Sequence, residues 1–328
     1  MRTVTWLGLC VGIGLAVALV VWRGARTIAG LLASTHWSLL LVVVFAVPML
    51  VLATFSWRLL FPPGGAPRFH FALAALWIGY SINILLPVAG VGGDVVRARL
   101  LALWSGNNRD AVASVVVDKT VQVVTVPLLG LIGLAALLRV VPDTRSLEAG
   151  VAGVVLIALV LAAAVFVQRA GAFAYLAARA PLAPRWNRDG LVERASDLDA
   201  DLRAIYGRPG TVVASCFLRL LARLSLSGEV WLAARLLGHP ISLADAVLLK
   251  SVGIVASAVA FPVPAGVGIQ EGSFVATGAV IGLSPDVALA TSLATRVREL
   301  VTTVPGVLTW EYIVGRGLWR RRVRGDER

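Results

Sequence analysis

The chain has 328 residues, of which 58% are hydrophobic and only 15% are charged, and its mean hydropathy is +0.86. Soluble globular domains carry about 25% charged residues, so this composition excludes a soluble protein and predicts an all-α, polytopic membrane helix bundle. The net charge of +12 fits anionic lipid headgroups and cytoplasmic loops better than nucleic acid, and the sequence has no nucleic-acid-binding motif.

Apolar runs of about 20 residues are long enough to cross a bilayer, and they predict about eight transmembrane helices. The runs lie near 4–22, 38–60, 69–88, 111–138, 149–168, 212–237, 243–262 and 286–314. The first run has no small-residue cleavage site, so we expect a retained helix rather than a signal peptide. Two stretches broken by Pro and Gly, 83–97 and 261–283, are expected to be re-entrant hairpins or extra crossings.

One long polar segment divides the chain and sets the expected orientation. The predicted parts are a first membrane half at 1–168, a polar loop at 169–211, a second membrane half at 212–315 and a basic tail at 316–328. Residues 190–206 of the loop are expected to form a surface helix. Because arginines concentrate in the loop and the tail, the positive-inside rule predicts that both face the cytoplasm.

The two broken stretches share a sequence pattern. The tetrapeptide Ala-Gly-Val-Gly occurs at 89–92 and again at 265–268, and an acidic residue follows each copy, Asp94 in the first and Glu271 in the second. Gly- and Pro-interrupted apolar segments at matching places in two halves point to a binding site near the membrane midplane. The pattern therefore predicts a two-fold internal repeat with two broken helices.

Charged residues follow the two acids at similar spacings. The pair Asp118-Lys119 begins 24 residues after Asp94, and Arg296 lies 25 residues after Glu271. A charge at the centre of a bilayer costs roughly 2.5–3.5 kcal/mol on insertion scales, so each such residue needs a partner or a function. Two helix N-termini aimed at one cavity would offer backbone N–H groups to an anion. We therefore expect Asp94 and Glu271 to come close to one central cavity.

These considerations select candidate site residues. The predicted substrate-binding residues are Asn83, Asp94, Arg97, Glu271 and Arg296, and secondary candidates are Pro87, Gly92, Gly93, Asp118, Lys119, Pro264, Gly266 and Gly268. We expect Arg97 and Arg296 to hold a phosphate. The two acids would orient these arginines, contact a cationic headgroup or carry a coupling proton, and the sequence does not choose among these roles.

Each candidate in the first half also has a purely structural interpretation. Asp94 is suited to be the N-cap of a helix that begins near Val95. Arg97 falls on the same helix face and can pair with Asp94. Asp118 and Lys119 are adjacent, point to different faces, and are expected to pair with other segments.

The candidates in the second half likewise have structural interpretations. Glu271 fits the first turn of a helix, where the helix dipole favours an acid. Arg296 can be the ion-pair partner of Glu271 or Glu299. Lys250 is expected to face Asp245 or a lumen.

No catalytic residue, metal site or cofactor is predicted. His36, His70 and His239 lie at no metal-ligand spacing, and Cys10 and Cys216 are far apart in apolar runs. The sequence has no P-loop, nucleophile elbow or His-Glu-x-x-His motif.

Two motifs carry a family resemblance. They are Asn83-x3-Pro87-x2-Gly90-x-Gly92-Gly-Asp94-x2-Arg97 and Pro262-x-Pro264-x-Gly266-x-Gly268-x2-Glu271 with the later Arg296. Together they resemble the flippase-like transmembrane family of lysylphosphatidylglycerol synthases. Lys119 departs from the family pattern, which usually has Arg at this place. Length and Arg-rich composition give a looser likeness to hopanoid-biosynthesis-associated members.

The resemblance implies a bacterial inner-membrane protein that moves a phospholipid or another membrane lipid between leaflets. Synthesis is not expected, because no segment is long enough for the soluble aminoacyl-transferring domain of the full-length enzymes. Two alternatives stay open, an intramembrane lipid-modifying transferase with Asp94 or Glu271 as general base, and a non-catalytic partner of a lipid (hopanoid) biosynthesis complex. The lipid, the direction of movement and the oligomeric state are left undetermined.

Overall fold

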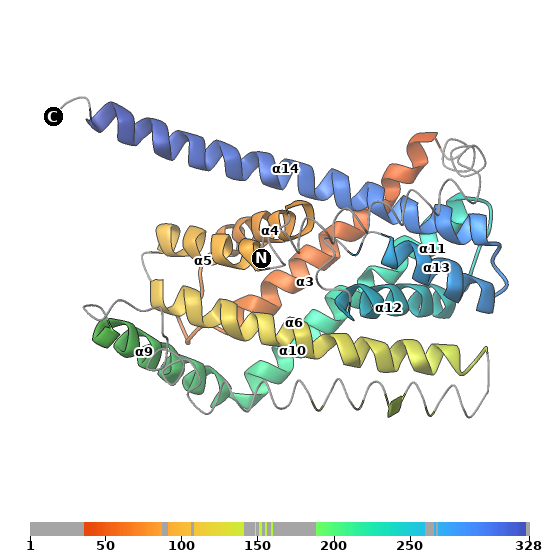
Figure 1. The fold of residues 1–328 in the computed structure, drawn as a ribbon, viewed down its shortest axis with the longest axis horizontal. Helices are drawn as coiled ribbons and strands as arrows, with labels where there is room; N and C mark the ends of the chain where they lie inside the picture. Colours follow the sequence, from red (N-terminus) through yellow and green to blue (C-terminus); the bar gives the residue numbers. More distant parts are fainter. Residues whose placement is uncertain are drawn as a thin grey trace.

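A computed structural model describes residues 36–86, 91–105, 108–140, 188–259, 266 and 268–325, with single positions between 148 and 159. Its described elements are all helices, which confirms the all-α prediction (Figure 1). The predicted helix at 4–22 and most of the one at 149–168 lie outside the described residues, as do Pro87 and Pro264.

The first half forms a long helix, a helical hairpin and a second long helix. In order, these are the 3-10 helix η1 (His36–Phe45), which continues into α3 (Ala46–Arg58), then α4 (Phe69–Leu85), α5 (Gly92–Ser105) and α6 (Asn108–Leu137). The apolar runs predicted near 38–60, 69–88 and 111–138 are confirmed as helices. Trp37–Arg58 and Arg109–Leu137 are long and apolar enough to cross a membrane.

The second half repeats this series. It consists of α10 (Pro209–Ser225) followed directly by α11 (Ser227–Leu236), then α12 (Leu243–Val259), α13 (Ile269–Val280) and α14 (Pro285–Gly325). The stretch Pro209–Leu236 is again of spanning length and hydropathy. A helix of 41 residues is about 60 Å long, so α14 exceeds a bilayer and continues through the predicted boundary at residue 315.

At each broken stretch, the helix before the break packs against the helix after it, as in a helical hairpin. In the first, α4 packs against α5 so closely that a Cβ added to Gly93 would lie 1.9 Å from the Gly79 carbonyl oxygen. The Gly93 N–H also donates to Asn83 Oδ1 at 2.8 Å. In the second, α12 packs against α13, and a Cβ on Gly253 would lie 2.9 Å from the Phe274 ring. Glycine is needed at the first crossing because the two helices touch through their backbones, and at the second because the Phe274 ring fills the space beside Gly253.

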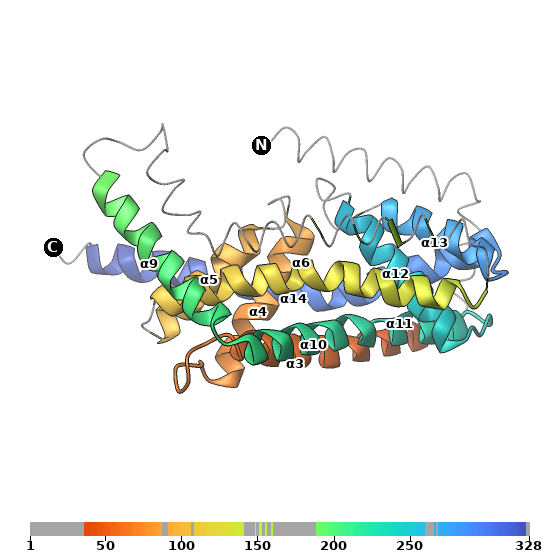
Figure 2. The ribbon, with the colours of Figure 1, turned by 90° about the horizontal axis from the view of Figure 1, so that it is seen from below.

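The packing partners of the two halves correspond. Helix α4 packs on α14 of the other half, and its counterpart α12 packs on α6. Helix η1 packs on α14, α10 packs on α6, and α3 and α10 pack on each other. In Figures 1 and 2, α6 and α14 run in opposite directions, as do α3 and α10, and the two hairpins lie toward opposite ends of the bundle. The predicted two-fold repeat is therefore present and inverted.

Helix α9 (Arg188–Tyr206) forms within the predicted polar loop. Arg109 Nε, near the start of α6, lies 2.6 Å from Asp201 Oδ2 and its Nη1 lies 3.3 Å from Asp197 Oδ2, while Leu202 is buried against the bundle. Helix α9 and the C-terminal end of α14 lie at the same end of the molecule (Figures 1 and 2). The described parts of the loop and of the tail are thus on one side.

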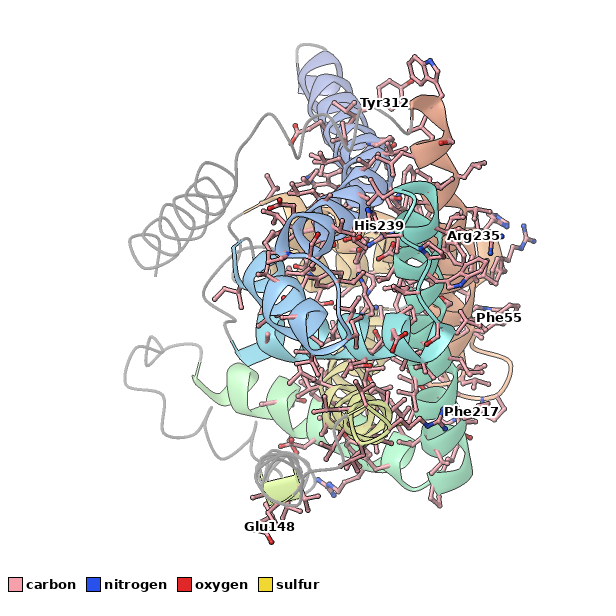
Figure 3. All side chains as sticks on the ribbon, turned by 90° about the vertical axis from the view of Figure 1, so that its right-hand side faces the viewer. Phe55, Glu148, Phe217, Arg235, His239 and Tyr312 are labelled. Atoms are coloured by element: carbon pink, nitrogen blue, oxygen red, sulfur yellow. The ribbon has the colours of Figure 1, made fainter. Side chains whose placement is uncertain are left out.

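Apolar side chains also cover outward faces of the bundle. Phe55 of α3 is 45% exposed and Phe217 of α10 is 59% exposed, and both point outward on the same side in Figure 3. In a membrane this surface faces lipid tails, where burial of apolar side chains inside the protein is not required.

Candidate functional site: a groove between α5 and α6

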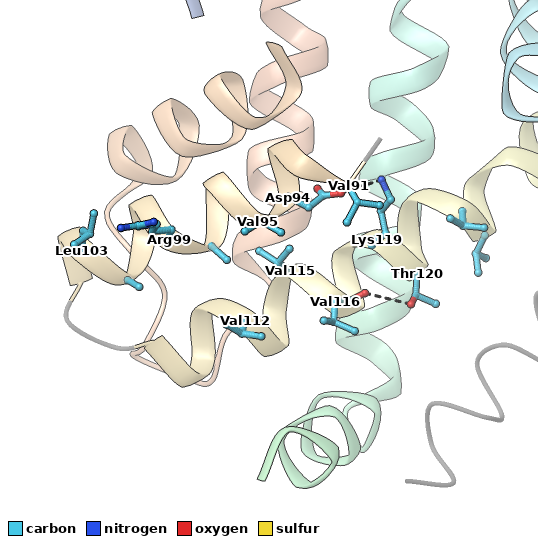
Figure 4. A pocket seen from close by; sticks show the side chains of 14 residues that line it. Val91, Asp94, Val95, Arg99, Leu103, Val112, Val115, Val116, Lys119 and Thr120 are labelled. Atoms are coloured by element: carbon cyan, nitrogen blue, oxygen red, sulfur yellow. Dashed lines mark hydrogen bonds and ion pairs between the residues drawn. The ribbon is translucent and has the colours of Figure 1, made fainter. Parts of the chain in front are cut away.

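A groove of about 730 Å³ runs between α5 and α6 (Figure 4). Its lining residues are Val91 just before α5, then Asp94, Val95, Ala98, Arg99, Ala102 and Leu103 from α5, and Val112, Val115, Val116, Lys119, Thr120, Val123 and Val124 from α6. On α5 these positions recur every three or four residues, which is one face of a helix. The result is an apolar trough with three charged side chains.

One end of the groove carries an ion pair. Lys119 Nζ lies 2.9 Å from Asp94 Oδ2, and the Lys119 side chain is 38% exposed. Lys119 is 11 residues into α6, hence about 16 Å from the start of that helix and close to half of a 30 Å hydrocarbon core. Arg99 lies on the same wall, between this ion pair and Leu103 (Figure 4).

Asp94 belongs to the first turn of α5. The helix begins at Gly92, and the Asp94 N–H donates to the Val91 carbonyl oxygen at 3.0 Å. The expectation that Asp94 is the N-cap of a helix starting near Val95 is therefore wrong by one turn. The position still suits an acid, because the helix dipole favours negative charge in the first turn.

Arg97 links Asp94 of α5 to the long helix α6. Its Nη2 lies 3.3 Å from Asp94 Oδ1, and its Nη1 lies 2.6 Å from Asp118 Oδ2. The guanidinium also stacks over the ring of Trp57, with its carbon 4.5 Å from the ring centre. Arg97 is only 3% exposed, and its Nε and Nη2 have no hydrogen-bond acceptor. The predicted pairing of Arg97 with Asp94 is present, with Asp118 as a second partner.

Asp118 is the centre of this first cluster. It is fully buried and accepts from Arg97, from Arg219 of α10 and, at 2.9 Å, from Gln122 Nε2. Arg223, one turn after Arg219, donates to the Gln122 carbonyl oxygen at 2.9 Å. Four cations, Arg97, Lys119, Arg219 and Arg223, thus accompany two carboxylates, Asp94 and Asp118. The first cluster carries a surplus of positive charge.

Glu271, the acidic residue of the second hairpin, contacts both the start of its own helix, α13, and the long helix α14. Glu271 Oε2 accepts from the Gly268 N–H at 2.6 Å, and Gly268 has a φ of +81°, a conformation that favours glycine. Glu271 Oε1 lies 2.8 Å from Arg296 Nε, and Arg296 Nη1 lies 2.7 Å from Glu299 Oε2. Both structural interpretations of these residues are therefore confirmed.

A buried carboxylate on α11 extends this second cluster. Glu229 is fully buried, lies 2.6 Å from Lys250 Nζ of α12, and also pairs with Arg298 of α14. Arg298 in turn lies 3.6 Å from Glu299. The expectation that Lys250 faces Asp245 is wrong, because Asp245 instead accepts from the Ser242 hydroxyl at 2.7 Å at the start of α12. Three cations balance three carboxylates here.

The sequence pattern of the family described as "Lysylphosphatidylglycerol synthase TM region" matches residues 6–306. The chain belongs to this family. No curated protein and no solved structure matched the chain. Membership confirms the resemblance inferred from the two motifs and makes the chain a membrane protein of a lipid-related family, while the likeness to hopanoid-associated members stays a prediction.

Of the family motif residues, the groove includes Asp94 and Lys119 but neither Glu271 nor Arg296. A shared central cavity for Asp94 and Glu271 stays a prediction, since the hairpin tips at 87–90 and 260–265 lie outside the described residues. Asn83 and Gly93 hold the first hairpin together, and Gly268 donates to Glu271 at the start of α13.

Two further candidate glycines, Gly266 and Gly92, lie next to the hairpin tips. Gly266 has a φ of +57°, and a Cβ there would lie 2.5 Å from Ser257 Oγ. Gly92 is the first residue of α5. A substrate contact of Arg97 or Arg296 stays a prediction, and both guanidiniums already lie between two carboxylates.

Sequence reasoning on this family member missed several charged residues. Arg219, Arg223 and Arg298 lie in apolar runs and were not singled out, although an intramembrane arginine is itself a signal of buried pairing. Arg99 was also missed. It lies eight residues after Val91, hence on the same helix face, and this spacing could have identified it. Within the part of the chain that the structure describes, no three His, Cys, Asp or Glu side chains gather as a metal site requires.

Proposed function

We propose that the protein moves an anionic or amphiphilic lipid between the two leaflets, with the lipid held in the groove between α5 and α6. The observation that carries the proposal is the groove itself, an apolar trough whose midplane end holds the Asp94–Lys119 pair. A lipid has the same two parts, a hydrocarbon chain and a polar headgroup.

The dimensions support this occupant. From Val91 to Leu103 the wall of α5 extends for about 18 Å, close to the hydrocarbon depth of one leaflet. A volume of about 730 Å³ lies within the usual range of small-molecule sites, roughly 300–1,000 Å³. Val95, Leu103 and Val112 are exposed on the groove, so an acyl chain can enter sideways from the bilayer.

The charges support an anionic headgroup. Lys119 is the most exposed cation of the first cluster, and Arg99 lies on the wall between it and the open end. We assign direct phosphate contact to these two residues. Arg97 acts as a positioning residue, because both Arg97 and Lys119 pair with Asp94. When Lys119 moves toward a bound phosphate, Arg97 Nη2 can form a hydrogen bond to the Asp94 carboxylate in its place.

The membrane side follows from charge. The loop at 169–211 and the tail from Arg316 would face the cytoplasm of a bacterial cell, in its inner membrane, as the concentration of arginine in these segments favours. Helix α9 and the C-terminal end of α14, the described parts of these segments, lie at one end of the bundle, which supports a common side. In this orientation the α5–α6 groove opens toward the cytoplasmic leaflet, because Leu103 is near the C-terminal end of α5, and this end of α5 lies at the same end of the bundle as α9 (Figure 1).

The test is reconstitution of the full chain into liposomes with labelled anionic or zwitterionic phospholipid, with leaflet transfer and chemical change scored separately. Lys119→Gln should slow transfer of the anionic lipid about tenfold to a hundredfold, because a charge-assisted hydrogen bond to phosphate contributes roughly 1.5–3 kcal/mol. Arg235→Gln is the matched control, since Arg235 is exposed on α11 and stacks over Trp231 outside the groove.

Three outcomes separate the alternatives. Transfer that is lost in Lys119→Gln and kept in Arg235→Gln supports the proposal. A chemically altered lipid would instead identify a transferase. Equal transfer rates in both variants and in the unaltered protein would refute the assignment of the headgroup to this groove, and the absence of transfer in all of them would leave a non-catalytic assembly role as the better account.

A further inference from the structure

The two hairpins are equivalent at the level of single residues. Helices α4 and α12 are each 17 residues long, and the glycine at the crossing is the eleventh residue of both, Gly79 in one and Gly253 in the other. Each glycine faces a residue of the second hairpin helix, Arg97 in the first half and Phe274 in the second. The inverted repeat therefore aligns through its packing contacts, independently of the Ala-Gly-Val-Gly match.

The ion pairs align in the same register. Asp94 pairs with Lys119 at 2.9 Å, and Glu271 pairs with Arg296 at 2.8 Å, and in both cases the basic residue is 25 positions after the acidic one. Lys119 and Arg296 are each 11 residues into their long helices. Because these helices run in opposite directions, the two pairs occupy matching depths measured from opposite ends of the bundle.

The two equivalent sites nevertheless differ in how open they are. Lys119 is 38% exposed and Arg296 15%, while Val112, on the wall of the first groove, is 43% exposed and its counterpart Leu289 is fully buried. The second pair of helices, α13 and α14, thus has the same charged end but is closed where α5 and α6 are open.

We infer that the two hairpins exchange these conformations, so that a groove between α13 and α14 opens when the groove between α5 and α6 closes. This inference rests on the proposed lipid movement and adds to it the second groove and the reciprocal coupling. In the exchanged state, α13 separates from α14 near Leu289, and the Glu271–Arg296 pair becomes as accessible as Asp94–Lys119 is here. The second groove opens toward the opposite leaflet, because the repeat is inverted.

The surroundings of α13 allow such a movement. A Cβ added to Gly272 would meet nothing within 4 Å, and Ala276, Ala279 and Val280 on the same helix are exposed. The second groove differs from the first in one charge, because Ala276 stands where the first has Arg99. A headgroup is therefore held less strongly on that side, which favours its release there.

The exchange is tested with two matched pairs of spin labels in the full chain, in lipid nanodiscs of defined composition. The pairs are L103C with V116C across the first groove and V280C with L293C across the second, in a background with C10S and C216S. Pulsed electron paramagnetic resonance then reports both distances. Arg296→Gln removes the cation that ties α13 to α14, so it should lengthen the second distance and shorten the first, and Lys119→Gln should do the reverse.

The decisive result is the sign of the coupling. Opposite changes of the two distances in both variants support the exchange. A change at one groove with the other unaltered overturns it, even if lipid transfer depends on Lys119, so the exchange and the proposed function fail separately. Should Arg296→Gln unfold, Glu271→Gln removes the same ion pair from the other side and gives the same prediction.

Discussion

The two buried charge clusters are built from similar parts but differ in balance. Around Glu229 and Glu271, three cations face three carboxylates, and the cluster links α11, α12, α13 and α14. Around Asp118, four cations face two carboxylates, and one of the cations, Lys119, opens onto the groove. The charges of the balanced cluster are thus satisfied within the protein, whereas the unbalanced cluster has a surplus of positive charge, which under the proposed function binds the anionic headgroup of a lipid.

The largest expected effect is the loss of a carboxylate from the balanced cluster. Glu229→Gln leaves Lys250 and Arg298 buried without their common partner, and breaking a buried ion pair costs about 3–5 kcal/mol. Unfolding in detergent, followed by circular dichroism, measures the loss. Glu311→Gln, on an exposed part of α14, is the control and should leave the unfolding free energy within about 0.5 kcal/mol of the unaltered protein.

A second test compares the two hairpins by replacing their glycines with alanine. Gly93→Ala would put a Cβ against the Gly79 carbonyl, which is backbone and cannot turn aside, so we expect destabilisation at the upper end of the usual 1–3 kcal/mol for overpacking. Gly253→Ala meets only the edge of the Phe274 ring and should cost less. Gly272→Ala, with open space around it in α13, should stabilise the protein by about 0.5–1 kcal/mol. If Gly93→Ala and Gly253→Ala lower the unfolding free energy equally, the helices of the first hairpin do not cross more closely than those of the second.

A smaller loss of stability is expected where the surplus charge is removed. Within the described residues no carboxylate lies at ion-pair distance from Arg223, which donates instead to Thr125 and to the Gln122 carbonyl. Arg223→Gln should therefore lower the unfolding free energy by only about 1–2 kcal/mol, whereas Arg298→Gln, in the balanced cluster, should cost about 3–5 kcal/mol. If the two substitutions destabilise equally, the distinction between the clusters does not hold.

Much of the fold was predictable because apolar runs, breaks and charge spacing are local features of the sequence. The helices at 38–60, 69–88 and 111–138 and the 25-residue spacing from Glu271 to Arg296 were visible in this way. The pairing of Lys250 was not, because it depends on which helices pack together, and α12 meets Glu229 of α11 rather than its own Asp245.

The candidate site was predictable only in part. Asp94 and Lys119 were named from the broken-helix pattern, but their common groove also needs Arg99 and the valines of α6, whose positions follow from the packing of α5 on α6. A short helix after a break, such as α5, has no strong hydropathy signal of its own. Its direction, and hence the groove, follow only from the three-dimensional crossing of the hairpin.

The most direct test of the account asks which lipid occupies the groove. A photo-crosslinking residue at Val95, on the groove wall, is compared with one at Phe217, on the outward face, in membranes with mixed anionic and zwitterionic phospholipids. The account predicts that Val95 captures anionic lipid in excess over Phe217, and that Lys119→Gln reduces this excess about tenfold or more. The same lipid ratio at both positions, unchanged by Lys119→Gln, would contradict it.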